Sequence, residues 1–128
     1  MRLASRNDGS RDGRLIVVSP DGLCYADAPI PTLQAALESW DESAPALAAI
    51  TDFPEPLDVA QLLAPLPRAW QWLDGSVYPS HGALMDKALG ITPFRPDWPP
   101  MYQGVSDTFY APRADVAQTL GRHQTDGC

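Results

Sequence analysis

The first third of the chain alternates short apolar runs with tight turns, a pattern typical of an antiparallel meander. Residues 2–6 and 14–19 are predicted strands, and the second of them is rich in β-branched side chains. Asp12 followed by Gly13 precedes the second strand as a turn signal, and another tight turn follows it at residues 20–22. A third short strand is expected at residues 23–26.

Apolar positions recur at helical spacing between residues 33 and 50. These positions are Leu33, Leu37, Trp40, Ala44 and Leu47. Thr32 can cap the start of a helix, whereas Pro45 interrupts the run, so we expect either one kinked helix or two short helices. The face that carries Leu33, Leu37 and Trp40 is predicted to pack on the strands as part of the core.

The rest of the chain has weaker and shorter patterns. Asp58 with Gln61 three residues later resembles a capping box, and Pro79 and Gly90 are suited to the first turn and the C-cap of one helix. Trp70 and Trp72 alternate, so in a strand they share one face, which predicts that they fill a core or pack on another domain. The expected elements are a loop at 52–56, a short helix at 58–63, a strand at 68–73, a helix at 79–89, an extended connection at 91–100 and a strand at 101–110.

Composition and charge restrict the classes of function. The 128 residues are enough for one domain with a modest core, and a hydrophobic content of 45% is compatible with folding. The net charge of −7, with only nine Lys and Arg residues, argues against nucleic acid and anionic membranes as partners. No leader-like or membrane-spanning apolar segment is present in the sequence, which favours the cytoplasm. The two cysteines, Cys24 and Cys128, favour a reduced pair over a disulfide.

The candidate chemistry lies at the predicted junction of a strand and a helix. Asp74 and His81 are seven residues apart there; an acid can ligate a hard cation and an imidazole can move protons. Two alternatives stay open, because an Asp-Gly pair is a common turn and a His near a helix start is often structural. For Asp107, between Ser106 and Thr108, a role in a turn or a cap is the stronger explanation.

Several motifs, taken in order, resemble bacterial proteins of the fumarylacetoacetate hydrolase family. The similarity runs from about residue 2 to about residue 113. The matching motifs are Arg2-Leu3-Ala4-Ser5, Arg11-Asp12-Gly13-Arg14-Leu15-Ile16-Val17-Val18-Ser19, Pro31-Thr32-Leu33-Gln34-Ala35-Ala36-Leu37, Ala64-Pro65-Leu66-Pro67-Arg68-Ala69-Trp70-Gln71-Trp72, Asp74-Gly75-Ser76 with Tyr78-x-x-His81, Met101-Tyr102-Gln103-Gly104 and Ser106-Asp107-Thr108-Phe109.

The resemblance implies an α+β fold. A small antiparallel β meander with packed helices forms the amino-terminal domain (residues 1–67). Residues 68–113 then begin a mixed β-roll, the catalytic domain of the family, and residues 114–128 form a divergent or disordered tail.

The resemblance also implies a reaction. In this family a divalent cation (Mg, Mn or Ca) held by carboxylates chelates a β-dicarbonyl or oxo-acid substrate. A His assisted by a Glu activates water, and a carbon–carbon bond is cleaved. By position, His81 matches the catalytic His, Asp74 matches a metal-ligating Asp, and Tyr78 is expected to line the substrate pocket.

The chain also departs from the family pattern. Gly82, Ala83 and Leu84 follow His81 where relatives often carry a Glu, and no Glu occurs after Glu55, so the Glu-x-Glu metal pair is absent. We therefore expect a truncated family member that is inactive in isolation.

Other interpretations stay open. One alternative is an interaction or oligomerisation module that forms a homodimer or pairs with a separate catalytic partner. Another is a small enzyme whose site is completed across a symmetric interface by Asp74, His81 and Asp107. The third is a remnant without a present function.

Overall fold

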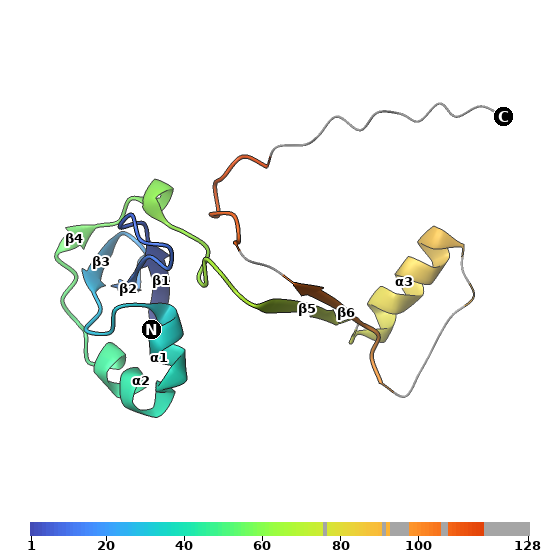
Figure 1. The fold of residues 1–128 in the computed structure, drawn as a ribbon, viewed down its shortest axis with the longest axis horizontal. Helices are drawn as coiled ribbons and strands as arrows, with labels where there is room; N and C mark the ends of the chain where they lie inside the picture. Colours follow the sequence, from blue (N-terminus) through green and yellow to red (C-terminus); the bar gives the residue numbers. More distant parts are fainter. Residues whose placement is uncertain (76, 91, 93–97, 106–107, 117–128) are drawn as a thin grey trace. The chain divides into compact units, whose positions relative to one another are not determined.

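A computed structural model describes residues 1–75, 77–90, 92, 98–105 and 108–116. The chain divides into two compact units, the first built on Met1–Pro67 and the second formed by Arg68–Phe109 (Figure 1). Each unit combines antiparallel strands with helix, so the predicted α+β class is confirmed. None of the helices in the described part of the chain has the length and apolar character needed to cross a bilayer.

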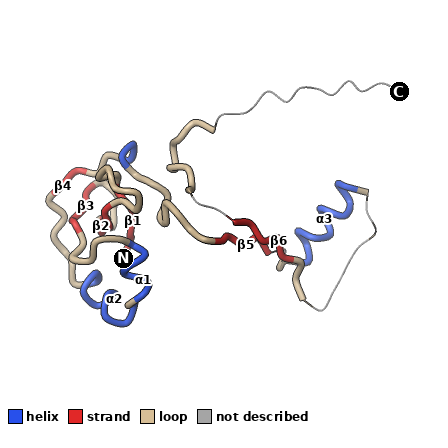
Figure 2. The backbone as a smooth tube through the Cα atoms, in the orientation of Figure 1, coloured by secondary structure: helices blue, strands red, loops and turns tan. Residues whose placement is uncertain are grey.

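The first unit contains a four-stranded antiparallel sheet in the order β1-β2-β3-β4 (Figure 2). The strands are β1 (Arg2–Arg6), β2 (Arg14–Val18), β3 (Cys24–Asp27) and β4 (Glu55–Pro56). The predicted three-stranded meander is confirmed. The fourth strand was missed, because residues 52–56 were expected to be a loop. β4 has only two residues, which is too short for an alternating pattern to reveal it.

Two short helices follow the meander, as one of the two expectations for this segment required. They are α1 (Leu33–Glu38) and α2 (Trp40–Ala48). Thr32 caps α1, since its Oγ1 accepts a hydrogen bond from the Ala35 amide at 3.1 Å. The helices are separated at Ser39, whose backbone is non-helical, whereas Pro45 lies inside α2. The proline therefore does not cause the break.

The core of the first unit lies between one face of the sheet and the two helices. Its fully packed members are Leu15, Val17, Ala28, Ala36 and Leu47. The predicted core face is only partly correct. Leu33 packs against this cluster, but Leu37 is 47% exposed and Trp40 is also exposed. The break at Ser39 changes the helical phase, so a stripe extrapolated through residues 33–47 does not stay on one side.

The turn before β2 requires a glycine. Gly13 has a φ of +68°, and a Cβ there would lie 2.8 Å from both the Arg6 carbonyl oxygen and Leu63 Cδ1. The segment around Leu63 also covers the outer edge of β1, because the Leu63 amide donates a hydrogen bond to the Ser5 carbonyl oxygen at 2.9 Å. The predicted helix at 58–63 is the 3₁₀ helix Val59–Gln61, capped by Asp58 through the Ala60 amide.

The turn between β2 and β3 is held by an ionised side chain. The carboxylate of Asp21 accepts hydrogen bonds from Ser19 Oγ at 2.5 Å and from the Leu23 amide at 3.0 Å. The hydrogen bond from Ser19, followed by that from Leu23, holds the pKa of Asp21 below its ordinary value of 3.8. The ionised form therefore stabilises the turn above that pH, and this contribution is lost as the pH falls through the lowered pKa.

Asp21→Asn is consequently expected to be destabilising at about pH 6 and less destabilising at about pH 2. Urea denaturation of both proteins at the two pH values measures the difference. Asp52→Asn, which removes the same charge from a loop, is the control. A destabilisation by Asp21→Asn that is equal at both pH values would contradict this role.

The second unit is a strand–helix–strand segment. It contains β5 (Gln71–Gly75), α3 (Pro79–Leu89) and β6 (Met101–Val105), with β5 and β6 antiparallel. The helix predicted at 79–89 is confirmed, and Gly90 is its left-handed C-cap with a φ of 64°. The predicted strands are found with shifted ends. Most of the predicted connection at 91–100, together with Ser106 and Asp107, lies outside the described residues.

The two tryptophans of this region have different environments. Trp72 packs against Tyr102 with ring centroids 5.1 Å apart, and its indole also covers Gly104, its cross-strand partner. Trp70 precedes β5 and is 94% exposed, so it does not fill a core in the described structure. Its packing on another domain stays a prediction.

Gly104→Ala is expected to displace the Trp72 indole, because a Cβ at residue 104 would overlap that ring. Overpacking of this kind costs about 1–3 kcal/mol, which a two-stranded sheet cannot easily absorb. Hydrogen exchange of the β6 amides measures the effect. Gly75→Ala is the matched control, because its Cβ would meet Val77 and Met101 at the ordinary contact distances of 3.7 and 3.9 Å. Equal protection in the two variants would contradict the prediction.

Candidate functional site

Asp74 is the fourth residue of β5 and lies opposite Tyr102 of β6. Trp72 is on the same face of the hairpin because side chains alternate along a strand. Asp74 is exposed, as are the other residues of β5. A carboxylate in this position has free access to a cation from solvent, but its own strand supplies no second acidic ligand.

His81 is the third residue of α3, in the first turn of the helix. Tyr78 is the N-cap residue, with an extended backbone, and Pro79 occupies the first helical position. This arrangement aligns His81 with Leu84, Met85 and Ala88, which follow it at helical spacing. That His81 belongs to the apolar stripe of this helix was not predicted from the sequence.

The side chains of this stripe remain exposed. Leu84, Met85 and Leu89 are all accessible, and no residue of α3 is buried. Tyr78, the predicted substrate contact, is 72% exposed. The structure thus places the three predicted site residues on one short strand-to-helix segment, in exposed positions.

A cation needs more ligands than this segment offers. Mg²⁺ and Ca²⁺ take six or more oxygen ligands, and no group of three His, Cys, Asp or Glu side chains suited to a metal occurs among residues 1–75, 77–90, 92, 98–105 and 108–116. Asp107 lies outside those residues, so its proposed participation across an interface stays a prediction. The described residues do not fit a metal by themselves.

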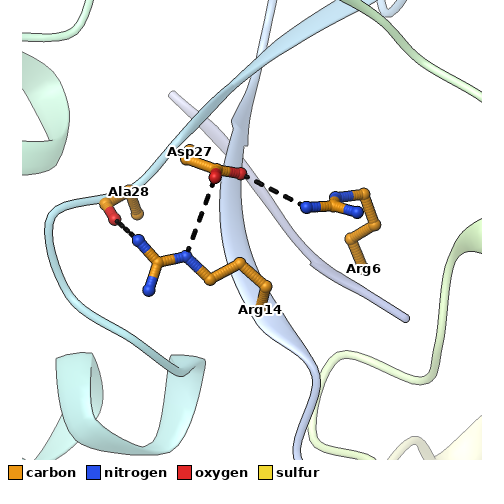
Figure 3. Close-up of polar contacts among 4 residues, drawn as sticks. All are labelled: Arg6, Arg14, Asp27 and Ala28. Atoms are coloured by element: carbon orange, nitrogen blue, oxygen red, sulfur yellow. Dashed lines mark hydrogen bonds and ion pairs between the residues drawn. The ribbon is translucent and has the colours of Figure 1, made fainter. Parts of the chain in front are cut away.

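A second polar cluster was not found by the sequence analysis. It lies in the first unit and joins Arg6, Arg14 and Asp27 (Figure 3). The pairing of Arg6 with Arg14 follows from the register of the β1–β2 hairpin. That signal was available once both strands had been predicted, because equal spacing from the turn places the two arginines opposite one another.

Comparison with known families identifies the first unit. The family model described as fumarylacetoacetase N-terminal domain 2 matches residues 1–68, which is more than half of the chain. The chain therefore belongs to the fumarylacetoacetase family, and residues 1–68 are its amino-terminal domain of type 2. A search of curated proteins finds no match. Asp74, Tyr78 and His81 lie beyond the matched range, so their roles rest on the resemblance described above and on their positions.

Proposed function

We propose that the chain supplies the amino-terminal domain and the first strand and helix of the catalytic domain in a metal-dependent carbon–carbon hydrolase. Its substrates would be β-dicarbonyl compounds or oxo-acids, the class that the family resemblance implies. The observation that carries the proposal is the family match over residues 1–68, followed immediately by a unit that holds Asp74 and His81 on a strand-to-helix segment.

Each site residue has a role in this proposal. His81 accepts the proton of the attacking water, a task for which an imidazole is suited near neutral pH. Asp74 would contribute one oxygen ligand to a divalent cation (Mg, Mn or Ca), which would polarise the substrate carbonyl, and Tyr78 would line the substrate pocket. Because one carboxylate binds Mg²⁺ weakly, the remaining ligands come from outside the described residues.

It follows that the described part of the chain has no hydrolase activity of its own. Activity requires a domain with further carboxylate ligands, carried either on the same polypeptide or on a separate catalytic partner. We assign the assembled protein to the cytoplasm and expect no nucleic-acid or membrane partner, since the chain carries a net charge of −7.

The test is an assay of acetylpyruvate hydrolysis with Mn²⁺ present. The purified chain is measured alone, and then after mixing with the catalytic domain of a family member that has the Glu-x-Glu pair. We expect turnover that depends on both components and is abolished by EDTA. Turnover by the chain alone would overturn the proposal, and so would a mixture no faster than the added domain by itself.

A second candidate function is an oligomerisation module. No apolar side chain of the second unit is buried among its described residues, although Leu73, Leu84, Leu89 and Val105 are large. Isolated two-stranded hairpins are marginal in water, so a second copy of the chain would stabilise this unit by covering those residues. Light scattering over a range of protein concentrations separates the candidates, and a monomer throughout would count against the module.

A further inference from the structure

The sheet of the first unit has two faces with different chemistry. Leu15 and Val17 point toward the helices and belong to the core. Arg14 alternates with them and therefore lies on the opposite face. The register places Arg6 directly across from Arg14, and Asp27 across from Ile16, two residues further along β2. Three charged side chains from three neighbouring strands thus meet on the face that the helices do not cover.

The geometry shows one carboxylate shared by two guanidinium groups. Figure 3 shows the Asp27 carboxylate between them, with one oxygen directed to each arginine. Arg6 Nη2 lies 3.6 Å from Asp27 Oδ1, and Arg14 Nε lies 4.0 Å from Asp27 Oδ2. Both separations are longer than the 2.7–2.9 Å of a charge-assisted hydrogen bond. Asp27 therefore balances charge without satisfying the donors of either arginine closely.

The other contacts fix the arginines in place. Arg14 Nη2 donates to the Ala28 carbonyl oxygen at 2.9 Å, and the guanidinium of Arg6 lies 5.4 Å from the ring centroid of Tyr25. Arg6 Nε is buried and has no hydrogen-bond partner among the described residues. Glu55 lies across from Tyr25 on this face, one strand further from the arginines. Two positioned cations, one loosely held carboxylate and an unpaired donor indicate a deficit of acceptors.

We propose that Arg6 and Arg14 bind a second carboxylate on this face of the sheet. The guanidinium fork matches the planar geometry of a carboxylate, and two guanidinium groups share the single carboxylate of Asp27. Asp8 adds an electrostatic interaction with Arg6, but its carboxylate is fully exposed and accepts hydrogen bonds from Ser10. Access is open, because the side chains of Arg6, Arg14 and Asp27 are 29%, 34% and 54% exposed. The carboxylate belongs to a small organic acid or to an acidic side chain of another protein. This inference stands independently of the proposed hydrolase function.

The experiment is a titration of the chain with sodium acetate, followed through the Nε–Hε resonances of the arginines by NMR. Sodium chloride at equal ionic strength serves as the reference, because it screens charges without offering a carboxylate. We expect the Arg6 and Arg14 resonances to shift saturably, with a dissociation constant on the order of millimolar, as one bidentate contact would give. Acetate shifts that follow the chloride shifts in both size and shape would overturn the proposal.

Two variants and one control define the site. Arg6→Gln should weaken acetate binding at Arg14 at least about tenfold, whereas Asp27→Asn should strengthen it about tenfold by removing the competing carboxylate. Arg2→Gln is the matched control, because Arg2 lies on the same strand and face but pairs with Val18 at the far end. Far-UV circular dichroism verifies that each variant folds. Unchanged acetate binding in folded Asp27→Asn would contradict the arrangement, even if Arg6→Gln did not fold.

The source of the carboxylate is distinguished by repeating the titration with succinate. A small dicarboxylic acid as the natural ligand class predicts binding at least about tenfold tighter than acetate, since its second carboxylate adds a further contact. Equal affinity of succinate and acetate shows that the site takes a single carboxylate, as in a side chain of a protein partner or a small monocarboxylic acid, and excludes dicarboxylic acids as the preferred class. Either result, with the variant pattern above, supports the site. Failure of both acids to saturate the resonances rejects it.

Discussion

Leu47→Ala is expected to lower the free energy of unfolding of the first unit by about 2–5 kcal/mol. Leu47 is completely buried and packs with Leu15 and Val17 of the sheet and with Ala36 of the neighbouring helix. Truncation removes three buried carbon atoms and leaves a cavity that two short helices cannot readily close. Because small domains are stable by only about 5–15 kcal/mol, this change consumes a large part of the total stability.

The measurement is urea denaturation followed by far-UV circular dichroism. Leu37→Ala is the matched control, because it makes the same chemical change in the adjacent helix at a side chain that is 47% exposed. We expect the control to cost no more than about 1 kcal/mol. An equal decrease in the free energy of unfolding for Leu47→Ala and Leu37→Ala would contradict the assignment of Leu47 to the core and of Leu37 to the surface.

The contrast between Leu37 and Leu47 also shows what the sequence alone could not predict. Apolar spacing correctly indicated helix between residues 33 and 50, and Pro45 was an evident reason to expect an interruption. The actual break is at Ser39, and no strong breaker marks that position. Since each helix then has its own orientation, periodicity across the break could not identify the buried face, whereas the short-range signals at Thr32 and Gly13 were confirmed.

Pairings between distant segments were also out of reach of local patterns. β4 is defined by its hydrogen-bonded partners on β3 and has almost no sequence signal of its own. By contrast, α3 was predicted at its full length, because Pro79 and Gly90 mark its ends through backbone chemistry that acts within a few residues. Elements with local end signals were predictable, and those that exist only through tertiary pairing were not.

The candidate site shows the same difference between features set by local sequence signals and features set by tertiary contacts. The position of His81 in the first turn of a helix was predicted correctly, whereas Asp74, expected just after a strand that ends at residue 73, lies inside β5 opposite Tyr102. The roles of Asp74 and His81 depend on further metal ligands and on residues that enclose a substrate pocket, and no local sequence pattern predicts either. The alignment of His81 with the apolar residues Leu84 and Met85 adds a consequence. Any domain that covers that stripe also encloses the imidazole and separates it, together with the water that it activates, from bulk solvent.

In the mixed assay described above, His81→Ala is expected to lower kcat by about 10²–10⁴-fold, the range typical for loss of a general base. KM should change little, because His81 contacts the attacking water in this proposal and Tyr78 contacts the substrate. Ser80→Ala is the control: it changes the preceding residue in the same turn of α3, and we expect activity within about twofold of the unmodified chain.

A comparison with Asp74→Asn separates proton transfer from metal binding. Loss of a ligand weakens the apparent affinity for Mn²⁺, so activity of Asp74→Asn should recover as the Mn²⁺ concentration is raised. Added metal cannot replace a missing proton acceptor, so His81→Ala should stay inactive over the same range. If both variants recover in parallel, His81 acts through the cation site and is not the base. If neither variant lowers activity, the catalytic groups lie entirely in the added domain, and the strand-to-helix segment of this chain has only an architectural role.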